Sequence, residues 1–308
     1  MLLLMDISIV IPNYNGKDLL EKNLPQVIKT AGETQIVVVD DASTDPSAEF
    51  IKKNFPNITL IEKVTNSGFA TSVNLGVKAA TGDVIFLLNT DAVPDPNCIK
   101  QVLTHFREAE VFAVGCLDKS IEQKKVVERG RGVGKIDRGF LIHGRGDTDK
   151  TNTLWASGGS SAYRKSLWEK LGGMDELYNP FYWEDIDLSY RALKSGYKIV
   201  FDRKAVVEHK HEEGSINKHY KPQEIKQLAY RNQFIFVWKN ISSKAYLIQH
   251  FFWLPYHLVK TLTRGDMAFT FGFLLALVQW KKIMKQSQQV LKTFIKTDEV
   301  VLAPFSHE

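Results

Sequence analysis

Polar residues that could carry chemistry stand in four short clusters, each beside a regular apolar pattern. The clusters are Asp40-Asp41, Asn89-Thr90-Asp91, Glu184-Asp185 and the pair His209 and His211. A carboxylate can accept a hydrogen bond from a nucleobase N–H, bind a divalent cation through oxygen, or remove a proton from a hydroxyl group. The same residue types also serve as helix caps, turn residues and solvated side chains. Their chemistry therefore depends on whether the fold brings them together.

The first part of the chain predicts such a fold, because apolar runs alternate with helical stripes. We expect buried strands at 6–12, 36–40, 58–62 and 84–88, and helices at 17–30, 46–54 and 68–80. Strands and helices that alternate over short links form a mostly parallel sheet with right-handed crossovers, so the predicted class is α/β. Ligands bind such sheets at the carboxyl ends of the strands. The clusters that follow strands therefore predict a single site at one edge.

The middle of the chain is less regular. Residues 118–150 are rich in glycine and charge, which favours an excursion or flexible loop near the site. We expect strands again at 153–163 and 197–201, and a helix within 181–195 that opens at the carboxylates. No G-x-G-x-x-G or P-loop sequence is present, so dinucleotide and P-loop chemistry are disfavoured.

The composition of the 308 residues is that of an ordinary globular protein, with only two cysteines, Cys98 and Cys116. A disulfide framework is therefore not expected, and a reducing, cytoplasmic compartment fits best. The apolar start MLLLMDISIV has no basic segment and no small-residue cleavage site, which favours a buried strand over a signal peptide. We expect an α/β domain over 1–216, a helical extension over 217–308, and no nucleic-acid partner.

The predicted extension is basic and aromatic. Residues 217–297 hold thirteen Lys or Arg against two acidic residues, Glu224 and Asp266. Two apolar stretches, 246–259 and 267–280, are shorter than the about 20 residues that a spanning helix needs. We predict that this segment binds the anionic inner face of the cell membrane without crossing it. A helical core or the interface of a homo-oligomer is the alternative.

Six segments, taken in order, resemble the family 2 glycosyltransferases, which have the GT-A fold. Each segment alone is weak, but the order of all six over roughly residues 6–216 is specific. The Asn-Thr-Asp triplet and the segment RNQFIFVWKN (231–240) are most similar to rhamnosyltransferase-type members, which act on bacterial surface polysaccharides or related glycans. The six segments are SIVIPNYNG (8–16), VVVDDASTD (37–45), NSGFATSVNLGVKAATGDVIFLLNTD (66–91), GGSSAYRKSLWEKLGGMDE (158–176), WEDIDLSYR (183–191) and HEEGS (211–215).

The resemblance implies a nucleotide-sugar donor with UDP or dTDP as its carrier. Asp41 would accept a hydrogen bond from the N3–H of a uracil-type base, and Pro12 and Tyr14 would line the base pocket. Gly68 would lie near the ribose or have a structural role, since glycine permits close approach to the backbone.

The resemblance also implies a divalent cation, Mg²⁺ or Mn²⁺, at the Asn-Thr-Asp triplet. Asp91 would be the direct ligand, and Asn89 would bind through water or the ribose because the family pattern has Asp at that position. In relatives, a histidine after the last sheet strand joins the metal site. His211 matches that position best, and His209 is its rival.

The acceptor side of the implied site lies at the start of the helix within 181–195. An acceptor hydroxyl must lose a proton as it attacks the anomeric carbon, and by resemblance Asp185 is the base that takes it. Trp183 and Glu184 would shape the acceptor side. The implied reaction is inverting sugar transfer to a hydroxyl group of a glycan or lipid-linked acceptor, in bacterial surface polysaccharide or glycolipid assembly.

Simpler interpretations remain for each cluster. Asp40 and Asp41 could cap a helix or be a pair of loop residues, and Asp91 could be a turn residue. Acids in a first helical turn are favoured by the helix dipole alone. Two rival functions follow from these alternatives. One is a sugar-nucleotide nucleotidyltransferase, and the other is a non-catalytic glycan- or membrane-binding relative.

Overall fold

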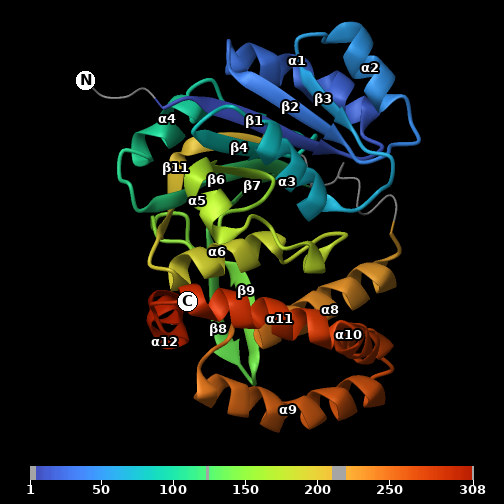
Figure 1. Ribbon diagram of the computed structural model, residues 1–308, viewed down its shortest axis with the longest axis vertical. Coiled ribbons are helices and arrows are strands. Elements are labelled where there is room, and N and C mark those ends of the chain that lie inside the picture. Colours follow the sequence, from blue (N-terminus) through green and yellow to red (C-terminus); the bar gives the residue numbers. More distant parts are fainter. Residues whose placement is uncertain (1–4, 123–124, 210–219, 307–308) are drawn as a thin grey trace.

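The first half of the sheet is parallel, as predicted (Figure 1). The computed structural model describes residues 5–122, 125–209 and 220–306. Its first four strands are β1 (Ile7–Asn13), β2 (Gln35–Asp40), β3 (Thr59–Glu62) and β4 (Val84–Leu88). The helices between them are α1 (Lys17–Ala31), α2 (Ser47–Asn54) and α3 (Phe69–Ala79). Val- and Ile-rich runs form the central strands because helices cover both faces of the sheet.

The second half makes the sheet mixed. The strand order in the described chain is β3-β2-β1-β4-β10-β6-β11-β5. Strand β10 (Ser160–Arg164) runs antiparallel between β4 and β6 (Val111–Glu122), and β11 (Lys198–His209) runs parallel to β6 and antiparallel to β5 (Ala92–Pro94). The remaining elements of this half are α4 (Cys98–His105), α5 (Lys165–Leu171), the short η1 (Glu176–Tyr178) and α6 (Glu184–Lys194). Expectation and structure differ at 153–163, where only the last residues form a strand.

Two hydrophobic cores enclose the sheet. One face packs against α1, α2 and α4 through side chains such as Leu24, Ile51 and Val102. The other face packs against α3, α5 and α6, for example through Val73 and Trp168. This three-layer arrangement confirms the predicted α/β class and fixes the carboxyl ends of β1, β2 and β4 at one edge.

The expected flexible loop over 118–150 is wrong. Residues 125–129 form β7, which pairs with the end of β6, and β8 (Gly132–Asp137) and β9 (Phe140–Arg145) form a separate hairpin. Gly139 lies in the turn between β8 and β9 with a φ of 80°, and a side chain there would collide with the backbone of His250, whereas Gly132, Gly134 and Gly144 lie within the two strands. The hairpin is ordered because Phe140 and Leu141 are buried against the C-terminal helices.

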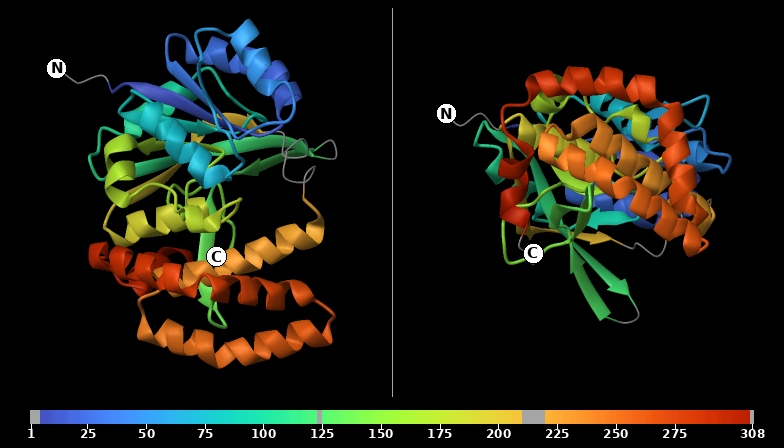
Figure 2. Two further views of the ribbon diagram at one scale, coloured as in Figure 1. Left: turned by 45° about the vertical axis from the view of Figure 1, so that its right-hand side comes forward. Right: turned by 90° about the horizontal axis from the view of Figure 1, so that it is seen from below.

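The predicted helical extension is confirmed. It contains α8 (Pro222–Asn240), α9 (Lys244–Thr263), α10 (Met267–Val278), α11 (Trp280–Val290), η3 (Leu291–Thr293), α12 (Asp298–Leu302) and η4 (Ala303–Phe305). These helices lie below the sheet domain, with α9 farthest from it (Figures 1 and 2). They share one hydrophobic core with the β8–β9 hairpin and α6. The boundary predicted at 216 falls outside the described residues.

A buried ionic cluster joins α8 to α6. Lys239 on α8 lies 2.7 Å from Asp187 on α6 and 2.5 Å from Asp175. Arg191 and Asn240 complete the set, each 2.7 Å from Asp187. Burial alone would raise the pKa of Asp187, but Lys239 and Arg191 hold the pKa well below its usual range. Because a broken buried pair leaves an uncompensated charge, this cluster fixes α8 against the helix that carries Glu184 and Asp185.

Candidate active site

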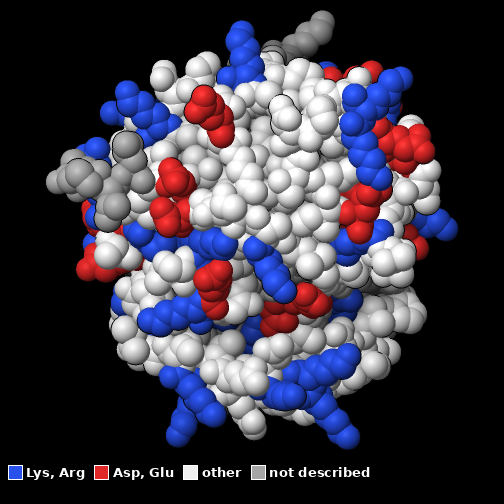
Figure 3. Space-filling view, turned by 45° about the horizontal axis from the view of Figure 1, so that its top comes forward, with Lys and Arg blue, Asp and Glu red and all other residues white. Residues whose placement is uncertain are grey.

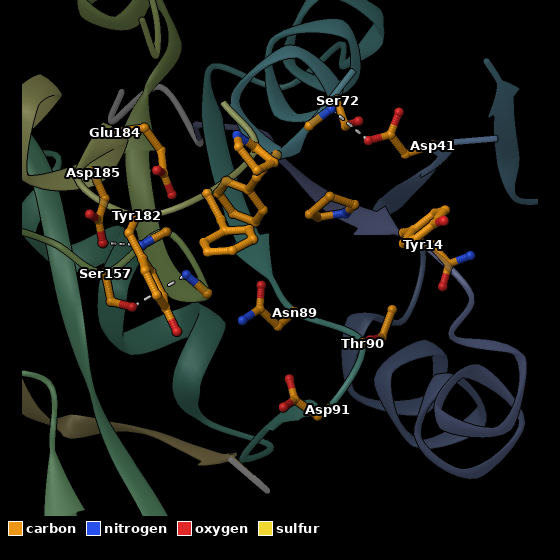
Figure 4. Close-up of a pocket in the computed structure, with 18 of the residues that line it drawn as sticks. Tyr14, Asp41, Ser72, Asn89, Thr90, Asp91, Ser157, Tyr182, Glu184 and Asp185 are labelled. Carbon is orange, nitrogen blue, oxygen red and sulfur yellow. Dashed lines mark hydrogen bonds between the residues drawn. The ribbon is translucent and has the colours of Figure 1, made fainter. Parts of the chain in front are cut away.

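A cavity of about 340 Å³ opens at the carboxyl ends of β1, β2 and β4. Eight of the predicted site residues line it: Pro12, Tyr14, Asp41, Gly68, Asn89, Asp91, Glu184 and Asp185. In Figure 4, Tyr14 and Asp41 lie on one side and Glu184 and Asp185 on the other, with Asn89 to Asp91 on the cavity wall between them. The fold therefore brings members of all four clusters into one cavity, since His209 lines it as well. The strand-end argument predicts this meeting for Asp41 and for Asn89 to Asp91.

Asp41 anchors the chain that enters α3. Its carboxylate accepts hydrogen bonds from the backbone N–H of Ser67 (3.0 Å) and of Gly68 (2.9 Å). Lys63 lies 2.5 Å from the same carboxylate and donates a hydrogen bond to Ser72 at 3.0 Å. The Asp41 side chain is 7% exposed. Three of its roughly four acceptor positions are therefore used, which leaves one for a ligand donor.

Asp40 has a different role from its neighbour. Its carboxylate accepts hydrogen bonds from the Asn13 side chain (2.7 Å) and from the backbone N–H and hydroxyl of Ser43 (2.9 and 2.7 Å). It does not line the cavity. Asp40 therefore ties the ends of β1 and β2 together, and this turn-stabilising role is the simpler interpretation that the sequence left open.

Asp91 lies beside His209 because β11 pairs with β5. Nε2 of His209 is 3.1 Å from Asp91, and Nδ1 is 3.6 Å from Asp118. Burial alone would lower the pKa of His209, but its interactions with the carboxylates of Asp118 and Asp91 outweigh burial and raise the pKa to about 10. His211 lies outside the described residues. Within the described residues, no group of three or more His, Cys, Asp or Glu side chains could hold a metal ion.

Glu184 and Asp185 open α6 at the cavity wall. The Asp185 carboxylate accepts hydrogen bonds from the backbone N–H of Gly158 (3.2 Å) and of Ile186 (2.8 Å). Burial raises the pKa of Asp185, although these two N–H groups oppose the shift. Burial and the neighbouring Asp185 raise the pKa of Glu184 well above its usual range. Oε2 of Glu184 is buried without a hydrogen-bond partner in the described chain.

Trp183 does not line the cavity, although we predicted it on the acceptor side. Its ring packs into the helical core, 4.9 Å from the ring of His143 and 5.3 Å from that of Phe236. Its neighbour Tyr182 lines the cavity instead and is 41% exposed. The reason is the backbone: both residues have positive φ, which turns one ring toward the cavity and the other toward the core.

The family model described as Glycosyl transferase family 2 matches residues 8–172, more than half of the chain. This chain belongs to glycosyl transferase family 2. The predicted rhamnosyltransferase-like character is also confirmed: the chain is 26% identical to O-antigen chain rhamnosyltransferase RfbN of Salmonella typhimurium over 67% of both proteins. Other curated relatives are longer, and the alignment spans 43% of one of them, a pre-mycofactocin glycosyltransferase of Mycobacterium tuberculosis.

Two solved structures confirm the GT-A-like fold of this family 2 glycosyltransferase. A structure of GalNAc-T7 with UDP, GalNAc and Mn²⁺ superposes with a TM-score of 0.62 at 18% identity, over 77% of this chain and 48% of that chain. The mannosyltransferase PcManGT from Pyrobaculum calidifontis, solved with GDP-Man and Mn²⁺, gives 0.56 at 17% identity, over 94% and 86%. At such identities the likeness shows the fold alone.

One wall of the glycosyltransferase cavity is held from outside the sheet domain. Nδ2 of Asn232 on α8 donates to the carbonyls of Tyr178, Phe181 and Tyr182 at 3.1, 3.0 and 2.8 Å. Arg231 donates to the Tyr178 carbonyl at 3.2 Å as well. An aromatic residue with positive φ is strained and persists only where its surroundings hold it. The hydrogen bond from Asn232 to the Tyr182 carbonyl stabilises this backbone conformation.

The sequence does not by itself indicate this role for Arg231 and Asn232. The only signal was two adjacent polar residues, Arg231 and Asn232, directly before the apolar run FIFVW. Tyr220, just before α8, was also missed; it lines the cavity, and its ring lies 4.8 Å from that of Phe181.

Proposed function

We propose that this family 2 glycosyltransferase moves a sugar, with inversion at the anomeric carbon, from a UDP- or dTDP-sugar to a hydroxyl group of a glycan or lipid-linked acceptor. We place the reaction in bacterial surface polysaccharide or glycolipid assembly, as the name of its relative RfbN suggests. One observation carries the proposal: Asp41, Asp91 and Asp185 line a single cavity. A non-catalytic relative would not need all three there, and family membership disfavours a nucleotidyltransferase.

The donor base would be read by Asp41 and Ser72. Both residues line the cavity, and they place a carboxylate acceptor near a hydroxyl whose oxygen already accepts from Lys63. The Ser72 hydroxyl can therefore donate to a ligand. Uracil and thymine offer an N3–H donor next to a carbonyl acceptor, which matches this pair. Pro12 and Tyr14 would line the base pocket beside them.

A divalent cation, Mg²⁺ or Mn²⁺, would lie near Asp91. The donor set fits such an ion, because a carboxylate at the cavity wall and the amide oxygen of Asn89 are hard oxygen ligands and the donor diphosphate supplies the rest. When bound, the cation would neutralise charge on the diphosphate. His211 remains our predicted second ligand, and His209, which contacts Asp91, remains its rival.

The transfer step would use Asp185 as the base. Its carboxylate, fixed by the N–H groups of Gly158 and Ile186, would accept the proton of the attacking hydroxyl as the new glycosidic bond forms. In the same step the bond from the anomeric carbon to the diphosphate would break, and the nucleoside diphosphate would leave. The raised pKa of Asp185 makes it a stronger base than a solvated aspartate. Burial raises the pKa of Glu184 well above its usual range, and in its protonated form Glu184 would donate a hydrogen bond to an acceptor or sugar oxygen. Inversion requires one base and no covalent intermediate.

A nucleotide-sugar panel tests the proposal. Each compound is added to the purified chain with Mn²⁺ or with EDTA, and the unfolding temperature and the rate of sugar release are measured. A nucleotide present at a hundred times its Kd stabilises the native state by about 2.7 kcal/mol. We expect stabilisation by UDP- or dTDP-sugars only with the cation. Stabilisation by nucleoside triphosphates with release of pyrophosphate would contradict the proposal, and so would indifference to every nucleotide.

We also propose that the protein works at the cytoplasmic face of the cell membrane, where lipid-linked acceptors are available. A homo-oligomer that buries the C-terminal helices is the competing arrangement. The structural argument for the membrane concerns α9 and α10.

A further inference from the structure

Helix α9 presents an apolar stripe to solvent. It has a single fully buried residue, His250, although most of its residues are apolar. Its exposed apolar side chains recur at helical spacing, which places them on one side of the helix. They are Ile248, Phe251, Phe252, Tyr256, Val259 and Leu262. A soluble helix normally turns such a stripe inward, so this surface is suited to a partner.

Helix α10 adds a second exposed apolar stripe. It packs on α8 through Gly272, where a side chain would collide with Tyr230 and Arg231, and its opposite side is left open. The open side carries Phe271, Leu274, Leu275 and Val278. No single helix of the described chain is long and apolar enough to cross a membrane. α10 reaches the required length and hydropathy only together with the segment Trp280–Thr293, and the two are bent by 71° relative to each other.

Positive charge surrounds these two stripes. Six Lys or Arg residues lie between positions 244 and 285: Lys244, Lys260, Arg264, Lys281, Lys282 and Lys285. The single acidic residue in that interval, Asp266, is paired with Lys226 at 2.6 Å. In Figure 3, Lys and Arg side chains stand along the lower edge, over the helical unit, with few acidic side chains beside them. A second copy of this surface would bring like charges together, whereas an anionic membrane would complement them.

We propose that the exposed stripes of α9 and α10, with their basic flanks, dock on an anionic lipid bilayer at the depth of the headgroups. Apolar and aromatic side chains would enter the interface, and the lysines would contact headgroup phosphates. α9 lies on the side of the helical unit away from the sheet domain, so the sheet domain would project from the membrane (Figure 1).

This docking would place the membrane close to the cavity wall. α10 packs on the turn of α8 that holds Tyr230 and Arg231, and the next residue, Asn232, holds the wall at Tyr182. Two packed helices, α10 and α8, therefore separate the docked surface from the acceptor side of the cavity. If the proposed transfer is correct, an acceptor anchored in lipid could reach the cavity without leaving the bilayer. The docking itself does not depend on that reaction.

Vesicle flotation tests the docking with the full chain and no donor. We expect the chain to float with phosphatidylglycerol–phosphatidylcholine vesicles, less well at high salt, and poorly with phosphatidylcholine alone. Val259→Glu on α9 should reduce vesicle binding by about tenfold or more, since it replaces an apolar contact with the bilayer by a charge. Val126→Glu on β7 is the matched control, because Val126 (67%) and Val259 (61%) are similarly exposed. The control should float like the parent.

The charge contribution has its own variant. Replacing Lys281, Lys282 and Lys285 by glutamine should weaken binding on the order of a hundredfold and reduce its dependence on salt. These three side chains are exposed, so the variant should fold even if Val259→Glu does not. Failure of the full chain to float, or equal flotation of Val259→Glu and Val126→Glu, would overturn the docking. A salt-resistant dimer that Val259→Glu dissociates would assign the surface to self-association instead.

Discussion

Replacing Asn232 by leucine should loosen the cavity wall while leaving a side chain of similar size. The Asn232 amide is fully buried and donates to three carbonyls, at 2.8 to 3.1 Å, on the segment that carries Tyr182. An amide group has two N–H donors, so about two good hydrogen bonds to these carbonyls are lost, together with the one that the amide oxygen accepts from Nε of Arg231 at 2.8 Å. Each buried polar group left unpaired costs about 1–3 kcal/mol. Water from the cavity can satisfy the carbonyl nearest to it. We therefore expect about 2–4 kcal/mol of lost stability.

The functional consequence should fall mainly on the acceptor. Without Asn232, the strained backbone at Tyr182 can relax, which would move its ring and the neighbouring Glu184. We expect kcat/KM for the acceptor to fall by about tenfold or more, since small misplacements in an active site are costly. Nucleotide affinity should change less, because Ser67 and Gly68 hold Asp41 independently. Transfer kinetics and calorimetric titration with UDP or dTDP measure the two effects.

Gln233→Leu is the matched control for this substitution. Gln233 lies next on α8 and donates from its amide to the Leu141 carbonyl of the β9 strand at 3.2 Å, and it does not line the cavity. It should lose some stability and keep its acceptor kinetics. Normal transfer by Asn232→Leu, or the same kinetic loss in both variants, would refute the idea that Asn232 positions the cavity wall.

Three further predictions concern the carboxylates of the cavity. Asp185→Asn should lower the transfer rate by about 10²–10⁴-fold with nearly unchanged nucleotide binding, and a turnover near the parental rate would exclude Asp185 as the base. Because burial raises the pKa of Asp185, the transfer rate of the parent protein should decline on acidification at a higher pH than a solvated aspartate would give. Asp91→Ala should abolish the EDTA-sensitive part of nucleoside diphosphate affinity measured by calorimetry, and unchanged metal dependence would make Asp91 a turn residue only. The pKa of Glu184 is raised in the folded protein, so its contribution to stability is full below the carboxyl pKa of the unfolded chain and is lost as pH rises. Glu184→Gln should therefore unfold at a higher temperature than the parent in mildly alkaline buffer and at the same temperature in acidic buffer. If instead the parent is the more stable protein at alkaline pH, Glu184 is ionised and stabilised by a partner.

Local patterns were sufficient to predict the fold class. The runs that form β1, β2 and β4 are rich in Val, Ile and Leu, and so short an apolar run is typical of a strand that is covered on both faces. The same logic predicted that Asp41 and Asn89 to Asp91 would meet, because parallel strands end at the same edge. It failed at 118–150, where three of the glycines that suggested a flexible loop lie within ordered strands and Gly139 lies in the turn between them.

The sequence by itself therefore determined the α/β class, the helical extension, and the meeting of Asp41 and Asp91 at one sheet edge, since each of these follows from patterns within a few residues. The place of Asp185 in the same site followed from the family resemblance. Only the tertiary structure decided that Trp183 turns into the core and Tyr182 toward the cavity, and that Asn232, some fifty positions away, holds that backbone. It also decided that Lys63 pairs with Asp41, and that His209 reaches Asp91 through β11. These contacts join residues distant in the chain, and their geometry depends on packing that no local periodicity encodes.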